Sequence, residues 1–305
     1  MAKHEVVIVG GGPAGLTAGL YASRAGLDSV LVERGICGGQ IVNATLVENY
    51  PGFPHGVPGL ELGSLMHQQA VRYGLQVVTG EVTGVARRDL YAISTTEGDF
   101  EAKAIIIAAG SEYRKLGAPG EERLLGHGVS YCATCDGFLF RGREVAVVGG
   151  GDTAITDALE LSQHVSKVYV IHRRDELRAG RVLQQRAFAQ PRLEFIWDSV
   201  VEEILGDKVL QGLRLRNVKT GQQSHLEVAG VFVAVGLMPN SRIFFDLLEL
   251  DDAGYIVTDE AMATSAPGIF AVGDIRRNSP RQVVTAVGDG ATAAMAALRY
   301  LQERG

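Results

Sequence analysis

Cysteine and proline are scarce in this sequence and positive charge is in deficit, and each shortage excludes a class of protein. Three cysteines among 305 residues cannot form the disulfide framework of a small secreted domain. Nine prolines beside 39 glycines predict tight turns near ligands rather than a disordered linker. Lysine and arginine number 29 against 35 acidic residues, so the chain lacks the broad basic surface that non-specific nucleic-acid binding needs.

Long apolar runs are missing as well. No stretch of about 18 apolar residues lacks a glycine-rich break, so we expect no membrane span. Met1–Glu5 contains one lysine and leads straight into Val6–Val9 and glycines, which is unlike a signal peptide. We therefore expect a cytoplasmic protein. At about 150 residues per domain, the length predicts two domains.

An internal repeat is the most informative feature of the chain. Val6–Val9 is followed by Gly10–Gly15, with the sequence GGGPAG, and Val145–Val148 is followed by Gly149–Ala154, with the sequence GGGDTA. Each copy predicts a buried strand, a glycine-rich turn and the start of a helix. A second short apolar strand follows in each half, and helices between such strands indicate parallel βαβ units whose sheets are covered on both faces.

The rest of each half predicts short β segments and a closing apolar strand, Ile105–Gly110 in the first half and Val231–Gly236 in the second. The tail predicts one more buried strand at Ile269–Asp274 and an alanine-rich helix over 288–301. We infer an α/β fold of two Rossmann-like dinucleotide-binding domains. The first domain is discontinuous, roughly 1–113 plus 243–305, and the second, roughly 116–240, is inserted into it.

Both glycine-rich loops are predicted to hold a pyrophosphate. At a helix N-terminus, free N–H groups and the positive end of the dipole point outward toward a bound anion. Gly12 would let the phosphate come close, and Gly15 would allow the helix to pack tightly on the strand. The alternative is that these glycines only make tight turns.

The residues that end the second strands distinguish the two expected ligands. Glu33 and His172 stand at the same spacing after Gly10 and Gly149. A carboxylate accepts hydrogen bonds from an adenosine ribose and repels an added phosphate, so we predict a nucleotide with a free ribose in the first domain. The second domain instead has a basic cluster, made of His172, Arg173, Arg174 and Arg178. Adjacent guanidiniums suit a 2′-phosphate, which predicts NADP(H) there.

This arginine cluster has a second interpretation. It could be a solvated helix face whose charges are paired with the acidic residues Asp175 and Glu176.

Cys132 and Cys135 form a CxxC motif. In a cytosolic protein with βαβ patterns, this spacing predicts a redox dithiol, and a helix starting there would stabilise a thiolate. Half of a zinc site and an inert buried pair are the alternatives, with Cys37 the only other sulfur of a cysteine. Asp136 follows directly and either delivers a proton to a leaving thiolate or caps a helix at the surface.

Two further features receive structural interpretations. Cys37 is interpreted as a small packed residue near a ligand. The stripe from Leu62 to Tyr73, which contains Leu65, predicts an amphipathic helix whose apolar side belongs to the core.

Taken together, these motifs resemble those of bacterial low-molecular-weight thioredoxin reductases, and the resemblance covers essentially the whole chain. The motifs that carry it are Gly10–Gly15, Gly38–Gln40, Val47–Gly52, Cys132–Gly137, Gly149–Ala154, His172–Asp175 with Arg178, Gly236–Asn240, Gly273–Asp274 and Arg281–Ala286. The resemblance implies FAD in the first domain, NADPH in the second, and a homodimer.

The resemblance also implies the residues at each cofactor. Those at FAD are Gly10, Gly12, Pro13, Ala14, Gly15, Glu33, Gly38, Gly39, Gln40, Ile41, Asn49, Val82, Ala109, Gly110, Gly273, Asp274, Arg281, Gln282 and Val283. Those at NADPH are Gly149, Gly151, Asp152, Thr153, Ala154, His172, Arg173, Arg174, Arg178 and Gly236. Thr153 stands where the family usually has serine, which keeps a hydroxyl group.

By the same resemblance, NADPH reduces FAD, FAD reduces the Cys132–Cys135 disulfide, and Cys132 attacks the disulfide of thioredoxin or a thioredoxin-like protein. Cys135 then faces the flavin, and Asp136 is the general acid. Because the dithiol and the NADPH loop share one domain, we expect a hinge at 113–116 and 240–244. The alternatives are a peroxiredoxin or a small-molecule disulfide as the partner, or a non-catalytic flavin redox sensor.

Overall fold

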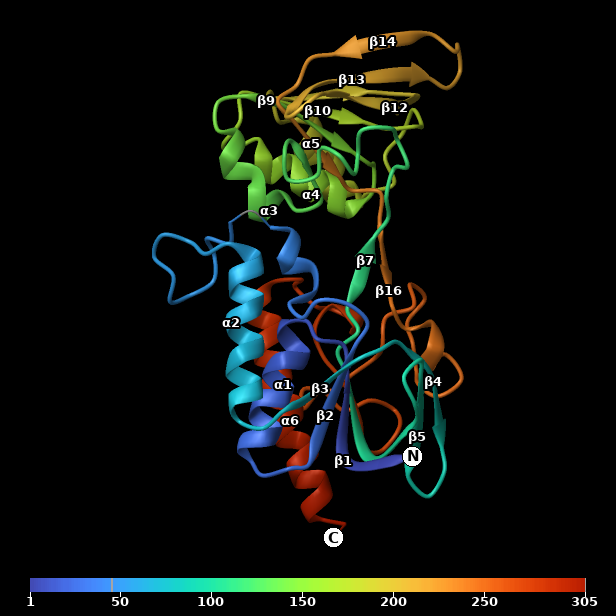
Figure 1. Cartoon of the computed structure of the whole chain (residues 1–305). Helices are drawn as coiled ribbons and strands as arrows, with labels where there is room; N and C mark the ends of the chain where they lie inside the picture. Colours follow the sequence, from blue (N-terminus) through green and yellow to red (C-terminus); the bar gives the residue numbers. More distant parts are fainter. Residues whose placement is uncertain (45, 305) are drawn as a thin grey trace. The chain divides into compact units, whose positions relative to one another are not determined.

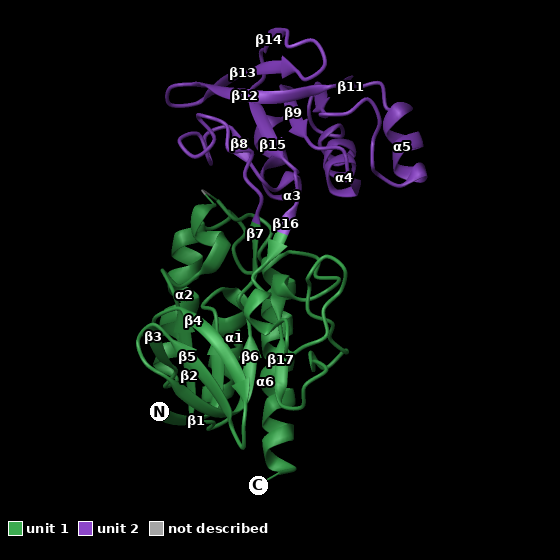
Figure 2. Cartoon of the chain, turned by 90° about the vertical axis from the view of Figure 1, so that its right-hand side faces the viewer, with its two compact units in different colours: residues 1–112, 238–305 green, residues 113–237 purple. Residues whose placement is uncertain are grey.

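A computed structural model describes residues 1–44 and 46–304 of the chain. The chain divides into two compact units, which Figure 2 colours separately. Unit 1 comprises Met1–Glu112 and Met238–Gly305, and unit 2 comprises Tyr113–Leu237. Each unit is built around its own main sheet.

Unit 1 contains a seven-stranded sheet in the order β3-β2-β1-β6-β5-β4, with β17 paired to β6. The strands are β1 (Ala2–Val9), β2 (Ser29–Glu33), β3 (Gln76–Thr79), β4 (Val82–Arg87), β5 (Tyr91–Thr95), β6 (Phe100–Ile107) and β17 (Ile269–Ala271). Strands β3, β2, β1, β6 and β17 pair in parallel, whereas β4, β5 and β6 pair antiparallel. The late strand β17 therefore returns the C-terminal segment to the first sheet.

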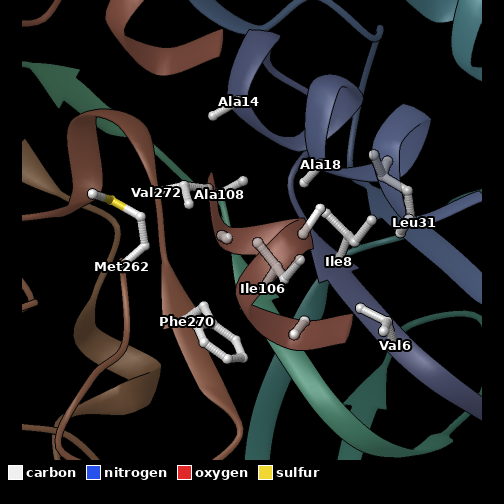
Figure 3. Packing of buried hydrophobic residues seen from close by; sticks show 14 of the residues in the cluster. Val6, Ile8, Ala14, Ala18, Leu31, Ile106, Ala108, Met262, Phe270 and Val272 are labelled. Atoms are coloured by element: carbon white, nitrogen blue, oxygen red, sulfur yellow. The ribbon is translucent and has the colours of Figure 1, made fainter. Parts of the chain in front are cut away.

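Side chains alternate between the two faces of this sheet. Val6 and Ile8 of β1 belong to a buried cluster that includes residues of α1 (Pro13–Arg24) and α6 (Val283–Gln302), shown in Figure 3. Val7 and Val9 belong to a second cluster on the other face, which the segment around Phe244 and Ile256 covers. Both faces are therefore buried, as the run of non-alternating apolar residues predicted.

Helices α1, α6 and α2 (Gly59–Arg72) run side by side in unit 1 (Figure 1). Helix α6 begins at Val283, so the prediction of a start at Gly288 was wrong. Its first turns contain β-branched valines and a glycine, and packing against α1 overrides their weak helix propensity. The stripe prediction for α2 was also partly wrong, because Leu65 and Tyr73 are 42% and 45% exposed.

Unit 2 contains a five-stranded parallel sheet in the order β11-β10-β9-β15-β8 and a three-stranded sheet in the order β12-β13-β14. The strands are β8 (Val129–Ser130), β9 (Glu144–Val148), β10 (Lys167–Ile171), β11 (Leu193–Ile196), β12 (Ser199–Gly206), β13 (Leu210–Asn217), β14 (Gln223–Leu226) and β15 (Gly230–Val233). The helices are α3 (Ala133–Asp136), α4 (Asp152–Leu161) and α5 (Arg181–Phe188). This unit repeats the strand–loop–helix–strand pattern of unit 1, which confirms the predicted α/β class.

Two short strands connect the units, β7 (Ser111–Tyr113) and β16 (Leu237–Pro239), and they pair with each other. The described residues also contain the 3-10 turns η1 (Gly39–Asn43), η2 (Gly137–Phe140), η3 (Arg242–Phe244) and η4 (Gly273–Ile275). Among the helices of residues 1–44 and 46–304, none has both the length and the apolar character to cross a lipid bilayer.

Candidate functional site

Two glycines of the first loop hold α1 tightly against the sheet of unit 1. Gly10 has a φ of +104°, and its N–H donates to the carbonyl of Val32 at 2.9 Å. A Cβ at Gly10 would lie 2.5 Å from the carbonyl oxygen of Ala108, and one at Gly15 would lie 1.9 Å from the carbonyl oxygen of Gly10. These positions require glycine for packing.

Gly12 differs from them because its missing Cβ leaves space. The nearest atom to an added Cβ would be the Cα of Gly39, at 3.9 Å. Gly12 is the N-cap of α1, no side chain caps this helix, and Pro13 opens it. Ala14 follows in the first turn and is buried against the core. The helix therefore presents uncapped N–H groups beside an open approach, which fits a pyrophosphate.

Glu33 ends β2 and closes this loop. Its carboxylate accepts hydrogen bonds from the N–H of Gly11 at 2.6 Å and the N–H of Gly35 at 2.9 Å. Cys37 lies next to Gly11, where burial and the negative charge of Glu33 raise the pKa of its thiol to about 11. Cys37 is therefore a packed, protonated thiol at neutral pH, in keeping with its predicted structural role.

The second loop, in unit 2, has the same backbone geometry. Gly149 has a φ of +151°, and its N–H donates to the carbonyl of Ile171 at 3.1 Å. A Cβ there would lie 2.4 Å from the carbonyl oxygen of Ala234. Gly151 is the N-cap residue of α4, and no side chain forms a capping hydrogen bond to this helix. A Cβ added to Gly151 would meet no atom within 4 Å. It therefore matches Gly12 in leaving space for a ligand.

His172 occupies the place that Glu33 has in the first loop. Its ring lies directly against Gly150, where an added Cβ would come within 2.4 Å of Cε1. The side chain is buried, yet its Nε2 atom has no hydrogen-bond partner among the described residues. Burial lowers the pKa of this imidazole, and the positive charges of Arg178, Arg174 and Arg173 lower it further. A buried imidazole with an unsatisfied nitrogen therefore lies beside three arginines of a basic loop.

The loop has three exposed arginines, Arg173, Arg174 and Arg178. Within residues 1–44 and 46–304, none of their guanidinium groups forms a salt bridge. The helix-face interpretation was wrong, because 172–180 contains no helix and Asp175 pairs with Lys219 at 2.7 Å. Asp152, in the first turn of α4, instead fixes the loop by accepting the N–H of Gly180 at 2.7 Å. The unpaired positive charges remain available for an anionic ligand.

Cys132 and Cys135 are joined in a disulfide, with their Cα atoms 5.3 Å apart. Cys132 is the N-cap of α3, and its sulfur accepts a hydrogen bond from the N–H of Cys135 at 3.2 Å. Both residues are half-buried. The pair therefore has the helix-terminal setting that stabilises a thiolate on Cys132, rather than that of two metal ligands.

Asp136 lies at the end of α3. Burial raises the pKa of its carboxyl group, and a hydrogen bond from the hydroxyl of Ser130 at 2.6 Å opposes this shift. Cys132 is the N-cap of α3, and although Asp136 is the N-cap residue of η2, its side chain makes no capping hydrogen bond there. The interpretation of Asp136 as a surface cap was therefore wrong.

The C-terminal part of unit 1 brings together several of the predicted FAD residues. Gly273 has a φ of +70°, and its N–H donates to Asp289 of α6 at 3.0 Å. Asp289 is buried and also accepts two hydrogen bonds from Arg276, at 2.6 and 2.9 Å. The hydroxyl of Ser279 donates to Asp274 at 2.9 Å, while burial raises the pKa of this carboxyl group. This network fixes the Gly273–Asp274 turn in place.

The N-cap of α6 also contacts the loop that precedes α2. The side-chain amide of Asn49 donates to the side-chain oxygen of Gln282, the residue before Val283, at 3.1 Å. Arg281 has a φ of +59°, and its guanidinium lies 5.7 Å from the centre of the Tyr255 ring. These contacts join segments of unit 1 that are far apart in the sequence.

Other predicted residues occupy the edges of these sites. Gln40, which follows Gly38 and Gly39 and precedes Ile41 in η1, donates to the carbonyl of Ser111 at 3.4 Å. Val82 is buried in the core at the start of β4, which leaves only its backbone for a ligand. Gly236, with a φ of +125°, ends the segment after β15. Thr153 is exposed and Ala154 buried in the first turn of α4.

Three contacting residues were missed from the sequence: Ser130, Asn240 and Asp289. Asn240 donates to the carbonyl of Ala109 at 2.8 Å, and its own N–H donates to the carbonyl of Gly110 at 3.0 Å. A lone carboxylate within the alanine-rich α6 was a signal for Asp289, since a charge on a buried helix face needs a partner. Ser130 had no comparable signal, and Asn240 was noted only as the last residue of the Gly236–Asn240 motif.

Two dinucleotide-type loops on parallel sheets, one closed by a carboxylate and one by a basic cluster, accompany a disulfide in the chain. This combination defines an oxidoreductase that moves electrons between nucleotides and a disulfide. The chain belongs to the pyridine nucleotide-disulphide oxidoreductase family, whose sequence model matches residues 4–290.

Similar proteins carry a more specific name. The chain is 49% identical over 302 residues to a thioredoxin reductase of Listeria monocytogenes, covering 98% of this chain and 94% of that protein. It is 44% identical to a bifunctional thioredoxin reductase/thioredoxin of Mycobacterium leprae, covering 98% of this chain and 66% of that protein. A crystal structure of a thioredoxin reductase from Streptococcus pyogenes matches with a TM-score of 0.95 at 45% identity, covering 99% of each chain.

FAD and NADPH are the cofactors of thioredoxin reductases in this family. The residues present fit both groups. Gly12 and Gly151 leave open space at uncapped helix N-termini, and His172 offers a buried nitrogen without a partner among the residues described. The predicted two-domain architecture of FAD and NADPH type is confirmed by the structural match.

Proposed function

We propose that this enzyme is an NADPH-dependent thioredoxin-disulfide reductase that acts through Cys132 and Cys135. The observation that carries the proposal is the disulfide at the N-terminus of α3, in the same unit as a loop whose arginines form no salt bridge with the described residues. The names of the relatives support thioredoxin as the partner, and in the Mycobacterium leprae protein the name joins reductase and thioredoxin.

We assign FAD to unit 1 and NADPH to unit 2. In unit 1, Gly12 and the first turn of α1 would hold the pyrophosphate, Glu33 the ribose, and the Gly273–Asp274 turn the other end of the dinucleotide. In unit 2, the corresponding groups would be Gly151 with α4 and the basic cluster. Bound FAD would supply the electron carrier between NADPH and the disulfide.

The chain's own residues then carry out disulfide exchange. The Cys132 thiolate attacks one sulfur of the partner's disulfide, forming a mixed disulfide while the partner's other sulfur leaves with the bonding electron pair. The carboxyl group of Asp136 gives its proton to that leaving thiolate. Cys135 next attacks the sulfur of Cys132, which releases the second partner thiolate and restores the intramolecular disulfide. Two electrons pass to the partner in total.

The geometry favours Cys132 as the attacking sulfur. The N–H of Cys135 points at the sulfur of Cys132 at 3.2 Å, and this donor stabilises negative charge on that atom. The carboxyl of Asp136 follows at the end of the same short helix. Its raised pKa increases the fraction that carries a proton near neutral pH.

Exposed apolar side chains next to the disulfide favour a protein as the partner. Phe138 and Leu139 in η2 are 41% and 54% exposed, directly after Cys135–Gly137. Thioredoxin would cover such a surface, whereas a small-molecule disulfide would leave it in water. We therefore place the partner's docking surface around these two residues.

We further propose that the two units rotate about a hinge at 113–116 and 240–244 during turnover. The disulfide and the proposed NADPH loop are both in unit 2, while the proposed FAD loop lies in unit 1. NADPH and the disulfide must therefore approach the flavin one after the other, which requires the units to move. A cross-link between the units should block multiple turnover while FAD stays bound. Full turnover in the cross-linked enzyme would refute the hinge.

A homodimer is the assembly that we propose. Leu60, Leu65 and Val71 of α2 and Tyr73 directly after it are exposed apolar side chains, and a second copy of the chain would remove them from water. Light scattering should give twice the chain mass.

A cytoplasmic location stays a prediction that rests on the low cysteine content.

The test of the function is NADPH consumption in the presence of a panel of oxidised thioredoxin-like proteins. We expect NADPH oxidation coupled to the appearance of partner thiols. The substitutions Cys132→Ser and Cys135→Ser should abolish this coupling while NADPH-to-dye electron transfer continues. Undiminished thioredoxin reduction by either variant would reject the role of the dithiol, and reduction of a peroxiredoxin or a small disulfide alone would favour the alternative partners.

A further inference from the structure

Ser130 connects two groups of the disulfide site that the sequence motif does not connect. It ends β8 and is 4% exposed, so its hydroxyl is shielded from water. The N–H of Cys132 donates to this hydroxyl at 3.0 Å. The hydroxyl in turn lies 2.6 Å from Oδ2 of Asp136 and 3.3 Å from the carbonyl oxygen of Cys132.

The single hydrogen of the hydroxyl decides between these acceptors. A serine hydroxyl has one hydrogen to donate and can accept further bonds. The carboxylate is the closer acceptor by 0.7 Å, which follows from the two distances of 2.6 and 3.3 Å, and it carries charge, so it takes the hydrogen. Ser130 therefore donates to Asp136 and accepts from the backbone of Cys132.

We propose that Ser130 is a positioning residue for disulfide exchange, holding the carboxyl group of Asp136 in register with the backbone of Cys132. This inference rests on the proposed function of Asp136 as the acid. The strand β8 is paired to β15 through Ser130 and Phe232, so the hydroxyl is attached to the rigid sheet rather than to the short helix. The acid is thereby fixed relative to the attacking cysteine through a group that takes no part in the exchange itself.

Burial has the largest effect on the pKa of Asp136, and the hydrogen bond from Ser130 is the side-chain contact that opposes it. Among described residues, the elements that pack most extensively against α3 are η2, which has no titratable side chain, and α4, which carries Asp152, Asp157 and Glu160. Glu160 bonds to the hydroxyl of Thr134 at 3.0 Å. Burial and the Ser130 hydrogen bond are the two influences on the pKa of Asp136, and they act in opposite directions.

A double-mutant cycle on the isolated exchange step tests this proposal. The enzyme is reduced with dithiothreitol, freed of reductant, and mixed with oxidised thioredoxin or with a small aliphatic disulfide, whose leaving alkyl thiolate also needs a proton, across a range of pH. Ser130→Ala should slow the reaction with thioredoxin about tenfold or more, as expected for a lost hydrogen bond to a charged group. Asp136→Asn should slow it about 100-fold. The double variant should be no slower than Asp136→Asn, because both changes remove one shared function.

The pH profile separates positioning from a merely structural role. Loss of the donor raises the pKa of Asp136, so the decline in rate at high pH should move to higher pH in Ser130→Ala. Ser162→Ala is the matched control, because Ser162 is 1% exposed and donates to the carbonyl of Leu159 at 2.7 Å, within the same unit. This control should change neither the rate nor the profile, and all variants should keep NADPH-to-dye electron transfer.

Two outcomes would overturn the proposal: rate losses that multiply in the double variant, or an unmoved high-pH limb in Ser130→Ala. Failure of the proposed function has a different signature. If thioredoxin is not reduced but the small disulfide shows the same coupling between Ser130 and Asp136, the partner assignment falls and the positioning role stands.

Discussion

The two glycine-rich loops share a backbone but differ in the side chain that closes them. In unit 1 the carboxylate of Glu33 accepts the N–H of Gly11 at 2.6 Å, whereas in unit 2 the ring of His172 lies against Gly150, its Nε2 unpartnered among the residues described. Three exposed arginines accompany His172 and none of them is in a salt bridge within the described part of the chain. One loop therefore carries negative charge where the other collects positive charge.

This difference shows how a repeated fold acquires two ligands. The glycines that need positive φ, Gly10 and Gly149, pack the loop, and the glycines with open space, Gly12 and Gly151, admit a phosphate in both units. The identity of the nucleotide then depends on the tip of the second strand, where a carboxylate favours a free ribose and guanidiniums favour a 2′-phosphate.

Removing the positive charge of unit 2 should have the largest effect. The double substitution Arg173→Ala with Arg174→Ala removes two charge-assisted hydrogen bonds, each worth about 1.5–3 kcal/mol. The Kd for NADPH should rise about 100-fold or more, and the Kd for NADH should stay within about twofold. Titrations of both nucleotides measure this, and an equal loss for the two would remove the argument for the 2′-phosphate.

Filling the open space of each loop should separate the two cofactors. Gly12 and Gly151 have φ values of −73° and −95°, which alanine adopts freely, and a methyl added at either position meets no close atom. For Gly12→Ala and Gly151→Ala we expect unchanged thermal stability, with a loss of FAD affinity in the first variant and of NADPH affinity in the second, each about tenfold or more.

Gly10→Ala is the contrasting control for these substitutions. Its Cβ would lie 2.5 Å from the carbonyl oxygen of Ala108, so this variant should lose thermal stability even without nucleotide. If Gly12→Ala lost FAD only because it unfolded, the distinction between packing and phosphate-approach glycines would be wrong.

Neutralising the carboxylate of unit 1 should have a moderate effect. Glu33→Gln keeps the shape but removes the charge that the N–H groups of Gly11 and Gly35 contact. The Kd for FAD should rise about tenfold, while NADPH binding by unit 2 is unchanged. Glu112→Gln, on a surface ion pair with Arg34, should leave both affinities unchanged. An equal loss of FAD affinity in both variants would show that the net charge of the unit, rather than the Glu33 contact, controls FAD binding.

The smallest expected effect is the contribution of His172 to the pH dependence of the free energy of unfolding. Its folded-state pKa lies below that of the unfolded chain, so the unfolded state takes up more protons at low pH. The contribution to stability is therefore complete above the unfolded pKa, near 6.5, and is lost as the pH falls below it. His172→Gln should make this loss smaller, since each tenfold difference in proton affinity between the two states corresponds to about 1.4 kcal/mol.

Urea denaturation of the nucleotide-free protein at several pH values measures that effect. Glu33 occupies the corresponding place in unit 1, so the effect should belong to unit 2. A stability that rises as the pH falls through this range would contradict a depressed pKa at His172.

Much of the fold was predictable because the residues of the repeat are those that its backbone conformation requires. Gly10, Gly15 and Gly149 stand where a side chain would collide, and buried apolar strands precede them, so the sequence marks both loops directly. The CxxC motif located the disulfide in the same way, since two sulfurs three positions apart can close within one turn. These features depend on neighbours in sequence.

The remaining features depend on partners that are distant in sequence. The pairing of Asp289 with Arg276 and Gly273, and of Asn240 with Ala109, brings separate segments together, and neither residue type identifies its partner. Lys219 binds Asp175 and so leaves the arginines unpaired, which overturned the helix-face interpretation. The start of α6 was missed because packing, not propensity, decides it.

The most direct test of the account is a thiol count after anaerobic addition of NADPH to the purified enzyme. With NADPH below one equivalent of enzyme and the new thiols trapped by alkylation, the account predicts that each NADPH oxidised yields two new thiols, at Cys132 and Cys135, while Cys37 stays unreactive in the native protein. This yield should require bound FAD and intact arginines in unit 2. NADPH oxidation in the FAD-loaded enzyme without new thiols at these two cysteines would contradict it.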